Sequence, residues 1–429
     1  MKKWARNIAS GLVISLLGAS LLAGCGSKSN EPNSNAGSNG NEGSGKAEQV
    51  EIEFFSNKAE NINTYKSLIS EFEQKNPNIK VKFQAPPEPD TVLKVRISTN
   101  DVPDVMSMGG SAHYREFVAT GVLQNYIGDA LLENVHPAYI EMIGKILGDK
   151  NDGTYGIPYA ANANGIIYNK EKLDSLGISP PKTWDEFVQA LDKAKAANEI
   201  PIYFTLKDPW TGMVALNSIA ANLQGDNFAE EKNQGKASFN ERYSEVADKM
   251  IKLIDYGHND NFGVGYSDGN TAFAKGNGVF YIQGVWAIPD ILKANPNIQL
   301  GVSAFPATND SAANKLVSGV DILLTTAKDT KHPEEARKFI EFLLEKDNAQ
   351  RYINEQTAFS TLKDIYQESP IMAGFKENFE NGSITSFPDH YYPNGMKPEN
   401  IVQEVFMKKD KQKFLETMDK EWDKILKRQ

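Results

Sequence analysis

The sequence predicts an α/β protein of two lobes with a cleft between them, and three observations lead to this expectation. Two blocks of alternating strand and helix patterns lie about a hundred residues apart in the 429-residue chain. Hydrophobic residues make up 40% of the chain, enough to bury a core, and the length suits two or three domains or lobes. No internal repeat is apparent, which argues against a solenoid.

Charge and composition exclude several functions. A net charge of −10 disfavours nucleic acid, because polyanion binders need a clustered basic surface. The single Cys excludes an intrachain disulfide framework and a thiolate zinc site, and five scattered His leave little material for a metal centre. We therefore expect no cofactor and no metal.

The first block begins after a polar segment. Val50, Ile52 and Phe54 alternate as in a strand with one buried face. Apolar residues then recur at helical spacing over 62–72, and alternation returns over 79–83. Strand, helix and strand within about 35 residues predict a βαβ unit and a parallel sheet.

The second block has the same character. Short strands are expected over 155–159 and 165–168, and a further one over 200–204. Between them Thr183, with Glu186 three residues later, predicts a capping box at the start of a helix. Further helices are expected over 242–256, 333–345 and 411–427.

The amino terminus has the pattern of an export signal. Residues 1–24 hold a basic start and an apolar run that Gly and Ser interrupt, too short for a secure membrane span. Leu22-Ala23-Gly24-Cys25 resembles the lipobox of bacterial lipoproteins, which implies lipid on Cys25 and a place on the outer face of the cytoplasmic membrane. Residues 25–46 then form a flexible tether, since 15 of residues 26–46 are Gly, Ser or Asn. A retained membrane helix and a buried thiol are the competing interpretations.

Several stretches together resemble extracellular solute-binding protein family 1, the maltose-binding-protein-like sugar-binding lipoproteins of ABC importers. They occur in the family's order between about residue 50 and residue 360. Gly278 and Phe280 depart from the family pattern, and the chain beyond residue 360 does not align. The matching stretches are Val102-Pro103-Asp104-Val105, Tyr155 to Tyr159 with Ile167 to Lys170, Leu173 to Phe187, Phe273 to Trp286, and His332 to Leu343.

The resemblance implies a two-lobed, type II periplasmic-binding-protein-like fold in which hinge strands link the lobes. The first lobe would hold 47–160 plus 304–335, and the second 161–303 plus 336–429. A monomer would close around a carbohydrate ligand and deliver it, chemically unaltered, to the transmembrane subunits of an ABC permease. Such a protein is not an enzyme.

A sugar needs aromatic surfaces for its C–H faces and planar hydrogen-bonding groups for its hydroxyl edges. We expect the polar candidates on loops at strand ends, where α/β lobes place ligands. The aromatic candidates are Trp210, Trp286, Tyr391 and Tyr392, and the polar candidates are Asn57, Ser111, Asn162, Asn164 and Asp321. Trp184 and Trp422 are interpreted as core residues. Core burial competes with a ligand role for the other aromatic residues, and turn formation competes for the Asn pair.

Three rival functions stay open. A secreted carbohydrate-active enzyme is the first, because Gly109 to His113 superficially resembles a nucleophile elbow, although the final Gly is absent. A binder of a non-sugar solute, such as a peptide, a metal or an anion, is the second. A charged ligand would call for an Arg or Lys cluster on the cleft loops, which instead show Asn, Ser, Gly and aromatic residues. A sensor subunit that signals to a receptor kinase has the same sequence signature as a transport protein.

Overall fold

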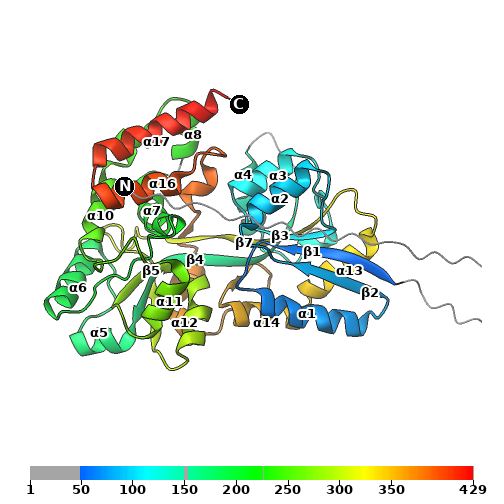
Figure 1. Ribbon diagram of the computed structural model, residues 1–429, viewed down its shortest axis with the longest axis horizontal. Coiled ribbons are helices and arrows are strands. Elements are labelled where there is room, and N and C mark those ends of the chain that lie inside the picture. Colours follow the sequence, from blue (N-terminus) through cyan, green and yellow to red (C-terminus); the bar gives the residue numbers. More distant parts are fainter. Residues whose placement is uncertain (1–48, 149–152, 226, 429) are drawn as a thin grey trace, which may run out of the picture. The chain divides into compact units, whose positions relative to one another are not determined.

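One mixed sheet is the frame of the part of the chain that this computed structural model describes, residues 49–148, 153–225 and 227–428 (Figure 1). The predictions for residues 1–24, Cys25 and the tether lie outside these residues. Within the described ranges the strands are β1 (Val50–Ser56), β2 (Ile79–Gln84), β3 (Val105–Met108), β4 (Ile157–Asn169), β5 (Phe280–Gly284), β6 (Leu300–Ser303), β7 (Leu316–Thr326), β8 (Phe359–Ser360) and β9 (Ile384–Thr385).

The strand order is β2-β1-β3-β7-β4-β5, while β6 and β8 pair with β4, and β9 pairs with β7. β1 is parallel to both β2 and β3, which confirms the predicted βαβ unit. β7 is antiparallel to β3 and to β4. The two longest strands, β4 and β7, therefore join the parallel part of the sheet to the segment around β5.

Helices flank the sheet along its whole length (Figure 1). The α-helices are α1 (Ile62–Lys75), α2 (Pro89–Ser98), α3 (Ala112–Ala119), α4 (Pro137–Leu147), α5 (Lys170–Leu176), α6 (Trp184–Ala196), α7 (Trp210–Leu223), α8 (Phe228–Asn233), α9 (Phe239–Arg242), α10 (Ser244–Ile254), α11 (Tyr266–Ala274), α12 (Ile288–Ala294), α13 (Pro333–Leu344), α14 (Lys346–Gln356), α15 (Ala373–Glu380), α16 (Pro398–Lys408) and α17 (Lys411–Leu426). The 3-10 helices are η1 (Ala130–Leu132), η2 (Val285–Ala287), η3 (Pro370–Met372) and η4 (Pro388–Tyr391).

Local sequence signals explain several of these boundaries. Thr183 Oγ1 accepts from Glu186 N at 3.3 Å, and Glu186 Oε2 accepts from Thr183 N at 3.2 Å, which is the predicted capping box at the start of α6. Pro333 occupies the first turn of α13, where its missing N–H costs no hydrogen bond.

Two strand predictions were wrong in detail. The segments 155–159 and 165–168 belong to one continuous strand, β4. Residues 200–204 form only an isolated bridge, Ile202 to Phe280, because Pro201 has no N–H to donate to a ladder.

The buried apolar side chains form two clusters. The first surrounds β1, β3 and β7 with α1, α3, α4, α13 and α14, and it extends to α12. The second gathers α6, α7, α10, α16 and α17, and Trp422 and Trp184 are buried in it, as predicted. α13 and α14 pack in the first cluster although the sequence analysis grouped them with the second lobe. The lobe boundaries remain a prediction.

The outer strand β2 has an exposed backbone edge at the end of the sheet. Ile79 and Val81 are buried against the first cluster, while the side chains of Lys80 and Lys82 reach solvent. This alternation gives β2 one apolar face and one charged face.

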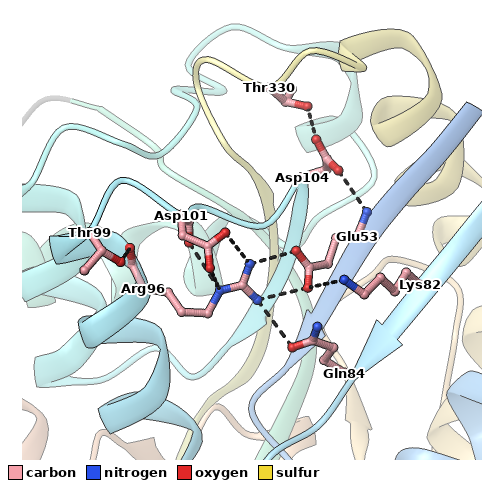
Figure 2. A network of polar contacts seen from close by, with 8 residues as sticks. All are labelled: Glu53, Lys82, Gln84, Arg96, Thr99, Asp101, Asp104 and Thr330. Carbon is pink, nitrogen blue, oxygen red and sulfur yellow. Dashed lines mark hydrogen bonds and ion pairs between the residues drawn. The ribbon is translucent and has the colours of Figure 1, made fainter. Parts of the chain in front are cut away.

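A polar network ties α2 and the loop before β3 to this end of the sheet (Figure 2). The Arg96 guanidinium donates to both carboxylate oxygens of Glu53 at 2.7 and 3.0 Å, and to those of Asp101 at 2.8 and 3.0 Å. Asp104, from the Val-Pro-Asp-Val stretch, accepts from Glu53 N at 2.8 Å and from Thr330 Oγ1. The bond to Glu53 raises the pKa of Arg96 above its ordinary value, so the guanidinium stays charged.

We expect Arg96→Met to lower the free energy of unfolding by about 2 kcal/mol, because it leaves the mostly buried Glu53 carboxylate without its main partner. Lys82→Met is the matched control. Its ammonium lies 3.9 Å from the same carboxylate but is 56% exposed, so the expected loss is under about 0.5 kcal/mol. Urea denaturation of both variants measures the difference, and equal losses would contradict the proposed importance of the Arg96 network.

Candidate functional site

A hollow beside the β4–β7 pair gathers residues from distant parts of the chain. It brings together three of the predicted site residues, Asn162, Trp286 and Asp321. The sequence analysis missed the other polar residues that line it. Its lining consists of Lys58, Glu60, Asn162, Val285, Trp286, Asp321, Tyr352, Gln356 and Ala358.

Asp321 is the electrostatic centre of this hollow. Lys58 Nζ lies 2.6 Å from its Oδ2, and Asn162 Nδ2 donates to its Oδ1 at 2.8 Å. Burial alone would lower the pKa of Lys58, but the carboxylates of Asp321 and Glu60 outweigh it and raise that pKa above its ordinary value. Lys58 thus stays charged, and its ammonium has donors beyond the one that Asp321 uses. Asn162 Oδ1 is buried without a partner among the described residues.

Trp286 lines the hollow, and two further aromatic residues, Tyr266 and Trp210, follow next to it. Trp286 lies in η2, directly after β5, and a side chain on Gly284 would come within 2.1 Å of its indole, so only glycine allows this ring position. Tyr266 Oη donates to Trp286 O at 3.3 Å, and the Tyr266 ring lies 4.9 Å from that of Trp210. Trp210 begins α7 and is 41% exposed, so its ring is open to solvent.

Tyr266 was missed by the sequence analysis, because a tyrosine after Gly265 has no distinguishing pattern. Asp208 Oδ2 accepts from Tyr266 N at 2.7 Å and so fixes the start of α11 near Trp210. Burial raises the pKa of Tyr266, and the Glu60 carboxylate raises it further. The hydroxyl therefore stays protonated and remains a hydrogen-bond donor.

A second group of polar atoms belongs to residues 386–394, here called the 386–394 segment, which includes η4. The His390 ring stacks on Phe387 at 4.9 Å and lies over Gly319 of β7, where a Cβ would come within 3.3 Å of His390 Cε1. Ser386 Oγ, Asp389 Oδ1 and His390 Nδ1 are buried and have no hydrogen-bond partner in the described part of the chain. Buried polar atoms are normally paired, so this concentration indicates a place where a polar ligand can bind.

Burial lowers the pKa of His390 below its ordinary value. The charge of Arg115 adds to this lowering, while Asp389 and Asp321 oppose it. The imidazole is therefore neutral at pH 7, and its Nδ1 can exchange a hydrogen bond with a hydroxyl group. The sequence analysis named the two tyrosines that follow and missed Asp389 and His390.

The neighbouring tyrosines have different surroundings. Tyr392 is 2% exposed, its hydroxyl lies 2.8 Å from that of Tyr243, and its ring meets Trp422 edge-on at 5.3 Å. Packing in the second cluster thus buries Tyr392 in this structure, and the ligand platform expected at this residue remains a prediction. Tyr391 is half-buried against the first cluster.

Asn162, Asn164 and Asp321 lie within strands, which corrects the expectation that they lie on loops. Asn162 is opposite Gly319 and Asn164 opposite Val317 in the β4–β7 pair. Because side chains alternate along a strand, Asn162 and Asn164 share a face. Asn164 is almost fully buried and donates to Val214 O of α7 at 3.3 Å. Residues 160–165 of β4 consist of alanine, asparagine and glycine, which have weak strand propensity. This composition is why the sequence suggested a turn there.

Asn57 and Ser111 are at the predicted strand ends. Asn57 follows β1, and its side-chain amide lies 2.9 Å from Ser107 Oγ of β3. Ser111 is the residue before α3 and is half-buried. Neither lines the hollow described above.

Metal-binding clusters and membrane-spanning helices are absent from the described ranges. There, no group of three or more His, Cys, Asp or Glu side chains is arranged to hold a metal ion. Nor does any helix in those ranges have the length and apolar character needed to span a bilayer.

Comparisons with known proteins agree on one family. The sequence profile of the bacterial extracellular solute-binding protein matches residues 56–350. The multiple sugar-binding protein of Streptococcus mutans is 30% identical over 363 residues, covering 81% of this chain and 84% of the relative. The melibiose/raffinose/stachyose-binding protein MelE of Bacillus subtilis is 25% identical over 78% of this chain and 79% of its own.

Solved structures agree with the sequence comparison. The structure of RafE in complex with raffinose superposes with a TM-score of 0.78 at 26% identity, covering 88% of this chain and all of that one. The apo form of RafE from Streptococcus pneumoniae has a TM-score of 0.74 at 26% identity, covering 89% and 99%. The mixed α/β fold is therefore that of periplasmic-binding-protein structures, as predicted.

We expect His390 to make the stability of the protein depend on pH. Its pKa is lowered in the folded state, so below about pH 6.5 the unfolded state binds more protons and the free energy of unfolding falls as the pH falls. His390→Gln removes this contribution, and thermal denaturation between about pH 5 and pH 7 will show a shallower loss of Tm than in the wild type.

His113→Gln is the control of opposite sign. The contact of His113 Nδ1 with Asp90 at 3.2 Å raises the pKa of His113, so its contribution to stability is present at low pH and is lost as the pH rises. If His390→Gln retained the full wild-type slope, the buried neutral state of His390 would be refuted.

Proposed function

We propose, from the premise that the chain belongs to the bacterial extracellular solute-binding protein family, that it captures a sugar or short oligosaccharide and delivers it to the permease of an ABC importer. Family membership makes it a solute-binding protein and not an enzyme. The observation that carries the proposal is the hollow in which Trp286 meets Asp321 and the unpartnered Oδ1 of Asn162. Tyr266 lies beside Trp286, and Trp210 lies beside Tyr266.

The chemistry of the hollow suits a neutral, hydroxyl-rich ligand. An indole face packs against the C–H face of a pyranose, and each such stack contributes about 1 kcal/mol beyond the buried area. Lys58 and Asp321 compensate each other's charge at 2.6 Å, so a ligand need not bring a charge of its own. Asn162 Oδ1 and His390 Nδ1 are unpartnered atoms that ring hydroxyls can satisfy.

The names of the relatives support this class of ligand. Multiple sugars are attributed to one relative, and melibiose, raffinose and stachyose to another. We infer that the ligand here is an oligosaccharide of this size.

Capture would proceed by closure of two lobes about β4 and β7. β7 contacts α4 and α13 of the first cluster and α7 of the second, so bending of these strands moves the clusters relative to each other. The packing of α13 and α14 favours placing both in the first lobe, a change from the boundaries given above. To change the ratio of closed to open molecules from 1:99 to 99:1, a ligand that contacts both lobes must favour the closed state by about 5.5 kcal/mol.

Anchoring belongs to the same proposal. Lipid on Cys25, followed by the tether of residues 25–46, would hold the protein at the outer face of the cytoplasmic membrane, close to its permease. The mature protein is expected to show the mass of acyl chains on Cys25, and an unmodified thiol at that position would reject the anchor.

We expect raffinose or a related oligosaccharide to raise the Tm of the purified protein, since a ligand at a hundred times its Kd adds about 2.7 kcal/mol of stability. Trp286→Ala and Trp210→Ala should each weaken that binding at least tenfold, about 1.4 kcal/mol, because each removes an aromatic surface. Isothermal titration calorimetry measures both affinities.

Tyr366→Ala is the matched control, because Tyr366 is 65% exposed and does not line the hollow. It should leave the affinity unchanged. A wild type that no mono- or oligosaccharide stabilises would overturn the proposed function, and folded Trp variants of normal affinity would overturn the aromatic assignment.

A further inference from the structure

Arg115 connects α3 to the 386–394 segment. Its Nη2 donates to Tyr392 O at 2.7 Å and to Asn394 Oδ1 at 3.2 Å. Its Nη1 donates to Ile146 O, near the end of α4, at 3.3 Å. One guanidinium thus joins two helices of the first cluster to the backbone beside Asp389 and His390.

These contacts are unusual because all of the acceptors are uncharged. No carboxylate of the described residues lies within ion-pair distance of Arg115, and burial lowers the pKa of its guanidinium. A half-buried charge without a counter-charge costs desolvation energy, so this Arg is a poor choice for stability alone. The planar guanidinium group, whose N–H donors point in fixed directions, is well suited to hold several oxygen atoms in a fixed arrangement.

Tyr391 packs against the first cluster, but other attachments of the 386–394 segment lead to the second. Tyr392 is buried there, and Asn217 of α7 accepts from Asp389 N at 3.3 Å. Arg115 therefore holds the segment from the first cluster at the Tyr392 carbonyl, while the Tyr392 ring and the Asp389 N–H are held from the second. Its charge also reaches His390, where it helps to keep the imidazole neutral.

We propose that Arg115 is a positioning residue for ligand binding: it holds the 386–394 segment against α3, so that Asp389 and His390 stay aimed at the ligand while the two clusters are close together. This inference rests on the proposed function. The bond joins the two clusters in this structure, so its loss makes their separation easier and speeds ligand release.

Arg115→Met tests the inference, because Met retains the apolar contacts of the side chain and removes all donors. Hydrogen–deuterium exchange of the ligand-free protein should show faster exchange in the 386–394 segment and unchanged exchange in α1. Stopped-flow measurement with raffinose as the probe should show dissociation about tenfold faster, with a similar association rate. Arg115→Lys can still reach one acceptor and should restore part of the slow dissociation.

Arg337→Met is the matched control. Arg337 is 43% exposed and pairs with Asp129 and Glu341, outside the 386–394 segment, so neither measurement should change. Unchanged exchange in Arg115→Met, or faster exchange with unchanged raffinose dissociation, would overturn the positioning role. A wild type that binds no sugar would instead contradict the proposed function, and the exchange measurement would still decide whether Arg115 holds the segment.

Discussion

The antiparallel pairing of β4 and β7 is the constraint on which the rest of the structure depends. These strands are the only long ones in the described sheet, and both clusters of buried side chains pack against them. Their register places Asn162 opposite Gly319, with Asp321 two residues further along β7. Because a shift of one residue would turn every side chain to the other face, the same hydrogen-bond ladder sets the fold and the position of the polar residues.

Glycines in β7 and β5 determine which side chains can approach this part of the sheet. Gly319 leaves room for the rings of Phe387 and His390, and Gly284 leaves room for the indole of Trp286. Side chains from η2 and from the 386–394 segment therefore come close to the sheet backbone. These rings belong to segments about a hundred residues apart.

Local patterns in the sequence were sufficient for much of the fold. Alternation identified β1, helical spacing identified α1, and the Thr183–Glu186 pair marked the start of α6, because each signal lies within a few residues. The site was only partly predictable. Trp286 and Asp321 could be named, but Lys58, Tyr266 and His390 could not, because their roles depend on neighbours that only the folded chain brings together. The burial of Tyr392 could not be predicted for the same reason: nothing local distinguishes a buried tyrosine from an exposed one.

The charged face of β2 affects how an extracellular protein associates with other copies of itself. The free edge of a sheet is a template on which another chain can add a strand, and extracellular proteins work without cytosolic chaperones. Lys80 and Lys82 lie on one face of this strand, beside Glu73 and Glu53, so a second copy that added a strand here would desolvate charged groups. The lysines of this short edge strand thus disfavour edge-to-edge pairing between copies of the protein.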